Sequence, residues 1–406
     1  MVFKCQEDSF LKEFTGTIVS CEPANLKLGD SELQGFNVIL DDTILFPEGG
    51  GQPCDYGTLN EKPVRSVIRK GSEAIHFVEH KDPFATGESV KQKIDWQRRL
   101  DHMQQHSGQH LITALFARDY NYDTTSWWMG TDSSYIELFT NDVTKKELNA
   151  IEEAANALIV EGRKVSVTVT SPEDGLKFQD ARAPKGLPAD HVGPVRVVSI
   201  EGIESNMCCG THVTNLSQLQ AIKLLHAEKS KGKVYVHFVA GNRVVKKLGE
   251  CYERELAMNN VLKGGPAVHL DLIQKVQANM KTLNKSFQKV LKENATMEAE
   301  KLNAMPEKPK YFSMHRKDGI EPDFINTFLR SAPTDIFYFL SVSDNTGKGH
   351  VVLRGDSEVI AKFGPIFMEL LDGKGSSNKE NNLQAKVNNV NKIKDCEAKL
   401  KQHFSQ

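Results

Sequence analysis

Apolar and polar residues alternate over short stretches in the first 90 residues of the chain. Such runs occupy positions 16–20, 36–40, 64–68 and 74–78, and turn-forming residues such as Lys70-Gly71-Ser72 lie between them. A period of two residues with intervening turns is typical of short β-strands. Several strands at this spacing predict a small β-barrel over residues 1–90.

The pattern becomes mixed from Asp95 onwards. Asp95 suits the N-cap of a helix that is expected to continue to about residue 118. Strand-like runs at 134–139, 164–170, 195–200 and 221–225 then alternate with a helical pattern at 145–160. This alternation predicts an α+β domain over residues 91–241.

A fully helical pattern begins after residue 241. A first helix over 243–263 is expected to end at Gly264-Gly265-Pro266, and the next helix carries apolar residues at a seven-residue repeat that only Asn294 breaks. The repeat consists of Ile273, Val276, Met280, Leu283, Phe287, Val290 and Met297. Because this period is typical of coiled coils, residues 242–306 are expected to form an antiparallel hairpin, to pair with a second subunit, or both.

The last part of the chain, residues 307–406, has a β-α-β-β-α pattern. Strands are expected at 311–315, 335–342 and 350–353 and helices at 322–330 and 357–371, followed by a tail rich in Lys, Asn and Gln. This order predicts a small C-terminal α/β domain. The chain as a whole is therefore expected to be an α+β protein of four parts.

Composition and charge narrow the class of protein. The 406 residues contain 51 Lys and Arg against 53 Asp and Glu, and the formal net charge of −2 argues against a protein that coats nucleic acid by bulk charge. The seven cysteines are odd in number and scattered, which favours a reducing compartment over a disulfide framework. The N-terminus lacks an apolar signal segment and no run approaches the ~20 apolar residues that span a bilayer, so we expect a cytoplasmic protein without a membrane partner.

Two short motifs carry candidate metal ligands. His106 and His110 lie four residues apart in a helical pattern, so their side chains share one helix face with Cβ atoms ~6 Å apart. Cys208 and His212 have the same spacing in a turn. Three imidazoles and one thiolate form a donor set that suits zinc better than magnesium or calcium. The spacing predicts one Zn²⁺ per chain.

The sequence around these residues is more specific than the spacing. The strings HSGQHL, CCGTHV and FPEGGGQP (residues 46–53) together resemble the editing domain of alanyl-tRNA synthetase and the free-standing alanyl-tRNA editing proteins, in their larger eukaryotic-type form. The resemblance covers about residues 1–255 and continues more loosely to the C-terminus. It implies a translation-factor-like barrel, a zinc-dependent editing domain and a C-terminal tRNA-binding-like domain.

The resemblance also implies a substrate pocket. Residues 48–52, Glu-Gly-Gly-Gly-Gln, form the glycine-rich loop. On spacing alone this loop could be a tight turn at a barrel rim, and it lacks the Gly-Lys-Ser/Thr ending of a nucleotide-binding loop. In the family it borders the editing pocket, and Trp128-Met129-Gly130-Thr131 matches a second pocket segment, in which Thr131 could bond a serine hydroxyl. The candidate substrate-binding residues are Phe46, Glu48, Gly49, Gly50, Gly51, Gln52, Met129, Gly130 and Thr131.

Neighbouring residues leave alternatives open. Cys209 stands where the synthetase motif has glycine, but register with His212 favours Cys208 as the ligand. His102 shares the helix face of His106, and an ordinary packed or exposed histidine is the favoured interpretation because the ligand set is already complete.

Basic residues after the second motif are candidate tRNA-binding residues or a solvated face. They are Lys229, Lys231, Lys233 and Arg243. Lys374 lies in the string Gly373-Lys374-Gly375, a shortened form of the glycine-rich string in the family's C-terminal domain, and this departure puts a specific tRNA contact there in doubt.

The implied activity is hydrolysis of the ester of mischarged tRNA, through the metal held by His106, His110, Cys208 and His212. The expected partner is tRNA(Ala) carrying serine, with glycine as a further substrate, and a homodimer through the helical region or the C-terminal domain is also open. Closed four-ligand zinc sites are usually structural, so the metal is expected to position the ester and help polarise it. The alternatives are a seryl-tRNA(Thr) deacylase and a non-catalytic, zinc-stabilised RNA-binding protein.

Overall fold

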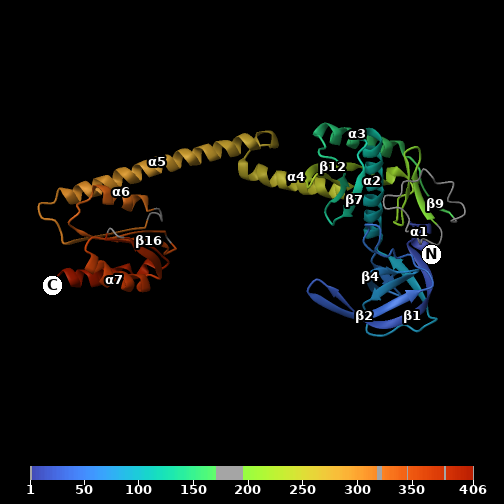
Figure 1. Cartoon of the computed structure of the whole chain (residues 1–406), viewed down its shortest axis with the longest axis horizontal. Coiled ribbons are helices and arrows are strands. Elements are labelled where there is room, and N and C mark those ends of the chain that lie inside the picture. The colour runs from blue at the N-terminus through green and yellow to red at the C-terminus, as the bar shows by residue number, and fades with distance from the viewer. Residues whose placement is uncertain (1, 171–194, 318–321, 345, 379–380, 406) are drawn as a thin grey trace. The chain divides into compact units, whose positions relative to one another are not determined.

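The computed structural model describes residues 2–170, 195–317, 322–344, 346–378 and 381–405 (Figure 1). Its contacts divide the chain into two compact units, Met1–Leu256 and Ala257–Gln406. Both units combine helices with mainly antiparallel sheets, which confirms the α+β prediction. The division into four parts is finer than these units and stays a prediction. Within the described ranges no helix has the length and apolar character needed to cross a membrane.

Unit 1 begins with helix α1 (Lys4–Glu7) and six strands that close on themselves in the order β1-β2-β5-β4-β3-β6. In β6 the buried side chains are Val90, Gln92 and Ile94, so alternate residues point inwards as the two-residue period predicts. The strands are β1 (Glu13–Leu28), β2 (Ser31–Leu40), β3 (Gly57–Leu59), β4 (Lys62–Lys70), β5 (Glu73–Val78) and β6 (Ser89–Ile94). The glycine-rich loop connects β2 to β3.

Helix α2 (Trp96–Tyr120) follows the barrel directly. The Asp95 side chain accepts a hydrogen bond from the Arg98 amide, which confirms the expected N-cap. The helix is buried along most of its length and ends at Asn121 in the left-handed conformation. A rigid, buried helix of this kind holds His106 and His110 one turn apart.

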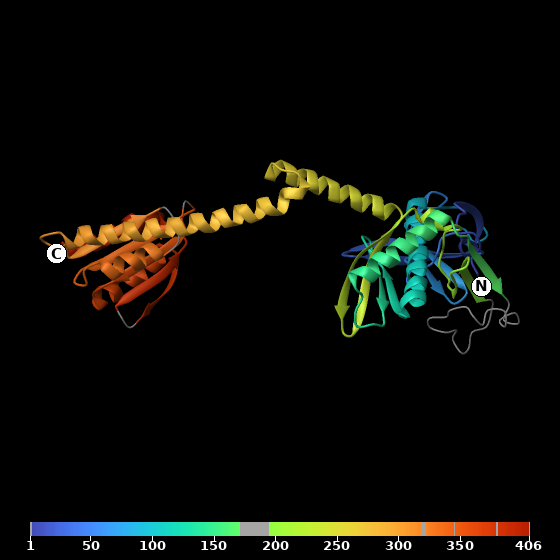
Figure 2. The same ribbon diagram turned by 90° about the horizontal axis from the view of Figure 1, so that it is seen from above.

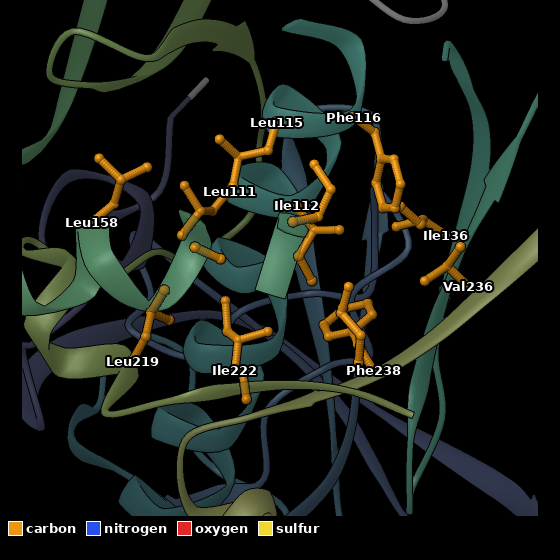
Figure 3. Packing of buried hydrophobic residues seen from close by; sticks show 14 of the residues in the cluster. Leu111, Ile112, Leu115, Phe116, Ile136, Leu158, Leu219, Ile222, Val236 and Phe238 are labelled. Carbon is orange, nitrogen blue, oxygen red and sulfur yellow. The ribbon is translucent and has the colours of Figure 1, made fainter. Parts of the chain in front are cut away.

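Helix α2 packs on a four-stranded antiparallel sheet of order β12-β13-β8-β7. Figure 3 shows Leu111, Ile112, Leu115 and Phe116 of α2 meeting side chains of that sheet and of α3, among them Ile136, Val236, Phe238 and Leu158. The elements are β7 (Thr124–Met129), β8 (Ser134–Leu138), α3 (Lys145–Glu161), β12 (Ile222–Ser230) and β13 (Lys233–Ala240). The predicted strand at 221–225 is thus longer in the structure.

A second, three-stranded sheet of order β11-β10-β9 carries the other half of the metal motif. Its strands are β9 (Val165–Thr170), β10 (Val195–Ile200) and β11 (Glu204–Met207), and the 3-10 helix η2 (Leu216–Leu219) follows. The turn that contains Cys208 and His212 begins where β11 ends. Hydrophobic residues of this sheet, including Val198 and Ile200, belong to the same core as α2.

A buried ion pair joins the barrel to α2. The Arg99 guanidinium contacts the Asp55 carboxylate, with Nε donating to Oδ2 over 2.9 Å, and both side chains are fully buried. Arg99 also donates to the backbone carbonyls of Ser9 and Ile44. Because Asp55 lies just after the glycine-rich loop, this pair fixes the loop relative to the helix that carries the histidines.

Unit 2 is a three-layer α/β structure. Helices α5 (His269–Asn303) and α6 lie on one face of the sheet and α7 on the other (Figure 1). Along β15 (Phe337–Ser343), Phe337 and Phe339 belong to a core with α7 and α8, whereas Tyr338 and Leu340 belong to a core with α5 and α6. The sheet order is β14-β15-β16-β18-β17, and only β14 and β15 are parallel. The other elements are β14 (Tyr311–Arg316), α6 (Asp323–Ser331), β16 (Gly349–Arg354), α7 (Ser357–Leu370), β17 (Gly373–Asn378), β18 (Asn382–Val387), the 3-10 helix η4 (Val390–Lys392) and α8 (Ile393–Phe404).

The region after residue 371 is more structured than its composition indicates. Two strands and a helix, β17, β18 and α8, follow where the sequence pattern shows only a polar tail. In β18 the buried residues Leu383, Ala385 and Val387 alternate with exposed polar ones, and their small number is masked by the Lys, Asn and Gln around them. The C-terminal domain therefore has a β-α-β-β-α-β-β-α order.

Helices α4 (Asn242–Leu262) and α5 (His269–Asn303) are separated by the expected turn, which contains the 3-10 helix η3 (Pro266–Val268). The C-terminal part of α5 packs on α6, and its N-terminal part extends beyond the sheet of unit 2 (Figure 2). There the heptad residues Val276, Met280 and Leu283 are 56%, 62% and 68% exposed. Pairing of this apolar seam with another helix stays a prediction.

Candidate metal centre

The structure brings His106, His110, Cys208 and His212 together. One ligand atom from each residue lies within 4.8 Å of all the others. The Cys208 Sγ is 3.4 Å from His106 Nε2 and 3.2 Å from His212 Nε2. Two histidines come from α2 and the other two residues from the turn after β11, about one hundred positions later, so only the tertiary fold creates this cluster.

Hydrogen bonds fix the orientation of the His106 ring. The Thr211 backbone amide donates to Gln52 Oε1 over 3.0 Å, and the same oxygen is 2.9 Å from His106 Nδ1. Since a backbone amide can only donate, the Gln52 atom at this position is the oxygen, and His106 Nδ1 must carry the proton. The unprotonated Nε2 of His106 therefore faces Cys208, as metal ligation requires.

The His212 ring is held in a similar way. The Ser107 Oγ accepts the Val213 amide over 3.1 Å and lies 3.0 Å from His212 Nδ1. When His212 Nδ1 donates to this oxygen, Nε2 is left as the nitrogen that faces the cluster. Ser107, which lies between His106 and His110 on α2, thus orients the ring of His212 on the distant turn.

Burial controls the protonation of the cluster. Desolvation, followed by the neighbouring imidazoles, lowers the pKa of His106 and of His212 well below the usual value. Burial likewise raises the pKa of the Cys208 thiol to about 12. Burial therefore favours neutral imidazoles at His106 and His212 and a protonated Cys208 thiol, and a divalent cation is the group that would favour the thiolate.

The turn around Cys208 is shaped for close approach. The Gly210 amide lies 3.3 Å from the Cys208 Sγ, and a Cβ at Gly210 would overlap the imidazole of His106. Arg196, which is buried, donates to the Cys208 carbonyl over 2.6 Å. The Arg196 guanidinium, a permanent positive charge on β10, thus lies against the segment that carries the sulfur. The donor chemistry and the lack of room for any side chain at Gly210 both fit a bound zinc ion.

The glycine-rich loop lies beside the cluster of four residues. Trp127 packs against His106 with ring centroids 4.6 Å apart and donates from Nε1 to the Gly50 carbonyl over 3.2 Å. Gly50 and Gly51 have φ angles of +62° and +86°, and a Cβ at Gly51 would lie 2.7 Å from the Trp127 ring. The loop can therefore approach the indole only with glycine at these positions.

The other predicted pocket residues differ in their surroundings. Phe46 and Met129 are buried, Gly49 is half-buried and Glu48 is exposed. The Gln52 amide is committed to His106 and Thr211. Thr131 is exposed and lines a shallow groove.

Two neighbouring residues with open interpretations lie outside the group of four. Cys209 is half-buried, with its Sγ 3.0 Å from the position of a Cβ on Gly50. His102 is buried on α2, and desolvation lowers its pKa to about 3. Both arrangements agree with the favoured interpretations: Cys208 is the sulfur that meets the histidines, and His102 is a packed side chain.

Most of the predicted tRNA-binding residues have acidic partners. Lys229 pairs with Asp142 over 2.9 Å and Lys233 with Glu137 over 2.6 Å. Arg243 pairs with Asp101 and donates to the Gly130 carbonyl over 2.6 Å, so it braces the end of β7. Lys231 is exposed in the β12–β13 turn, and Lys374 is exposed on β17 of unit 2.

Several functional residues escaped the sequence analysis. Ser107, Thr211 and Arg196 have no spacing signature, because their partners lie far away in the sequence. Trp127 also has no spacing signature: it packs on the core of unit 1 while its ring meets His106. The position of Ser107 inside the string His-Ser-Gly-Gln-His was the only signal that could have identified it.

Comparison with known proteins agrees with this arrangement. The model of the family "Threonyl and Alanyl tRNA synthetase second additional domain" matches residues 195–236, which include Cys208 and His212. The chain is 44% identical to "Alanyl-tRNA editing protein Aarsd1" of Danio rerio, over 99% of this chain and 98% of that protein. It is 43% identical to Aarsd1-A of Xenopus laevis, over 100% and 98% of the two chains. It is 42% identical to Aarsd1 of Mus musculus, again over 100% and 98%. The chain therefore belongs to the alanyl-tRNA editing protein Aarsd1 family.

Proposed function

We propose that the chain is a zinc-dependent deacylase that hydrolyses the ester of mischarged tRNA(Ala), chiefly seryl-tRNA(Ala), with glycyl-tRNA(Ala) as a second substrate. The observation that carries this proposal is the buried group of three histidines and one cysteine beside the glycine-rich loop. Membership of a family whose relatives are named alanyl-tRNA editing proteins supports the class of substrate.

Zinc, when bound by His106, His110, Cys208 and His212, would supply a Lewis acid for the ester carbonyl. The residues of the chain hold the site rigid: Gln52 and Ser107 fix two imidazoles, and the Gly210 amide stabilises the sulfur. Because the ligands are buried, bulk water is largely excluded and a bound ester would be fixed in one orientation. Four protein ligands favour a positioning role for the metal over direct water activation.

Substrate and tRNA contacts are part of the same proposal. We assign Phe46, residues 48–52, Met129 and Gly130 to the pocket wall, and the Thr131 hydroxyl to recognition of the serine side chain. The proposed phosphate contacts are Lys229 on β12, Lys231 in the turn that follows, Lys233 on β13, and Lys374. A cytoplasmic homodimer through α5 or the C-terminal domain completes the proposal.

A second candidate function is hydrolysis of seryl-tRNA(Thr). The matching family model is shared by the threonyl and alanyl synthetases, so the domain alone does not select the tRNA. Full-length similarity to the alanyl-tRNA editing proteins favours tRNA(Ala).

The decisive experiment is a deacylation assay with purified protein and four substrates: seryl-tRNA(Ala), glycyl-tRNA(Ala), seryl-tRNA(Thr) and correctly charged alanyl-tRNA(Ala). We expect fast loss of serine from tRNA(Ala), slower loss of glycine and no loss of alanine. Treatment with a chelator should remove the activity, and added Zn²⁺ should restore it. Full activity of the metal-free protein, or no activity on any substrate, would overturn the proposal.

Chelation also distinguishes the proposed enzyme from the alternative of a non-catalytic, zinc-stabilised RNA-binding protein. A purely structural metal holds the fold, so its removal would unfold unit 1. Circular dichroism of the chelated protein should instead show its helical signal largely retained while deacylation is lost.

A further inference from the structure

A row of aromatic side chains crosses the face of the four-stranded sheet that does not pack on α2. Trp128 of β7 lies opposite Tyr135 of β8, Tyr135 opposite His237 of β13, and His237 opposite His226 of β12. Successive ring centroids are 5.6, 5.6 and 4.5 Å apart, and the two histidine rings are parallel within 8°. The four rings therefore form one continuous row of ring contacts, tilted by 31° and 55° at the first two contacts, that runs from edge strand to edge strand.

The two ends of this row are accessible from solvent, and Tyr135 and His237 between them are half-buried. Trp128 is 54% exposed, which is unusual for a tryptophan, and the His226 side chain is also 54% exposed. The alternate residues of the same strands, such as Ile136 and Val236, are fully buried in the core beneath. The sheet thus has one apolar face covered by α2 and one aromatic face left open.

The position of Trp128 is built into the local structure. The indole lies over Gly130, where a Cβ would overlap the ring, and Arg243 holds the Gly130 carbonyl. Arg243 is in turn fixed by its ion pair with Asp101 of α2. An exposed side chain held in one orientation loses little entropy when a ligand stacks on it.

We propose that this aromatic row is a stacking surface for the unpaired bases at the 3′ end of the tRNA; the inference rests on the proposed function. The rings are of the amphipathic kind on which bases stack, and the side chains around them are polar or charged, including Glu137, Glu228 and Lys233.

The row begins next to the metal centre, on the opposite face of the sheet. Trp127 and Trp128 are neighbours on edge strand β7 and point to opposite faces, so one indole meets His106 while the next begins the row. The scissile ester is at the 3′ terminus, and the nucleotides before it must leave the metal centre past nearby surface. Strand β7 is the edge around which they would pass, and Trp128 is the first ring they would meet.

The test is Trp128→Ala in the full chain, with Trp128→Phe as the conservative variant and Tyr252→Ala as the matched control. Tyr252 is 58% exposed on α4, outside the row. Loss of stacking on one base should raise KM for seryl-tRNA(Ala) by about 5- to 150-fold. The kcat should stay within about twofold, Trp128→Phe should recover most of the loss, and zinc content should be unchanged.

A binding measurement makes this test independent of catalysis. Fluorescence anisotropy with uncharged tRNA should show the same increase in Kd for Trp128→Ala, and removal of the four unpaired 3′ nucleotides should abolish the difference between wild type and variant. If the wild type binds tRNA in this way but deacylates none, the proposed function fails while the surface stands. Unchanged KM and Kd, or a loss confined to kcat, would overturn the stacking surface.

Discussion

The cluster of His106, His110, Cys208 and His212 in unit 1 and the apolar seam of α5 differ in how completely their surroundings define them. His106 and His212 are buried, and each has its Nδ1 held by a side chain from another segment. Met280 and Leu283 repeat at regular intervals along one helix, and both are more than half exposed. The cluster forms only when unit 1 is folded, because its residues come from distant segments. The seam requires only that α5 is helical, and its partner would be a helix that does not pack on the sheet of unit 2.

This difference predicts which single substitutions should change stability or activity most. A group that is buried with a unique partner leaves an unpaired polar atom or charge behind when that partner is removed, and this is costly. Substitution of an exposed apolar residue leaves no buried polar atom unpaired, so its cost in folding free energy is small. Four substitutions sharpen the contrast, and they are taken in order of decreasing expected effect.

Asp55→Ala should have the largest effect. It leaves the Arg99 guanidinium buried without its carboxylate, which is expected to lower the free energy of unfolding by about 3–5 kcal/mol. The matched control is Glu79→Ala, which breaks the exposed ion pair with Arg65 and should cost under about 1 kcal/mol. Urea unfolding of both variants measures the difference. Equal losses would mean that the barrel and α2 are not joined through this pair.

Cys208→Ala tests the cluster itself. Loss of a ligand should remove the metal and reduce kcat/KM for seryl-tRNA(Ala) by about a hundredfold or more. The adjacent Cys209→Ala should retain the metal, because Cys209 lies outside the group of four. Metal content by mass spectrometry decides between them. Since His226, Glu228 and His237 form a second group of ligand atoms, the count should be repeated in His226→Ala.

Gln52→Ala should have an intermediate effect. It removes the acceptor that sets the tautomer of His106, so metal affinity should fall by about 10–100-fold while the four ligands remain. Competition with a zinc-binding dye measures this affinity. A variant that binds zinc as tightly as the wild type but has a raised KM would show instead that Gln52 contacts substrate, as its place in the glycine-rich loop had suggested.

The sequence predicted the four residues of the cluster but not the residues that orient them. Spacing and family strings together identified His106, His110, Cys208 and His212, because ligand geometry constrains residues within each short motif. The partners that orient them, Gln52 through its amide and Ser107 through its hydroxyl, depend on contacts across 54 and 105 positions, and no local pattern encodes such contacts. Strand β18 was missed for another reason: its few apolar residues are surrounded by polar ones, and only the packing on α7 distinguishes it from a tail.

Leu283→Glu should have the smallest effect on the fold and the clearest effect on assembly. As an exposed residue on α5, Leu283 should change the free energy of unfolding of unit 2 by no more than about 0.5 kcal/mol. If the seam pairs with a second copy, the wild type should sediment as a dimer and the variant as a monomer, because a buried charge at a coiled-coil position opposes association. Lys285→Glu, which alters charge on the same helix off the seam, should leave the mass unchanged. A hairpin with α4 would give the opposite result: a loss of stability with no change in mass. The exposed seam is thus an interface between copies only if the mass changes while the fold does not.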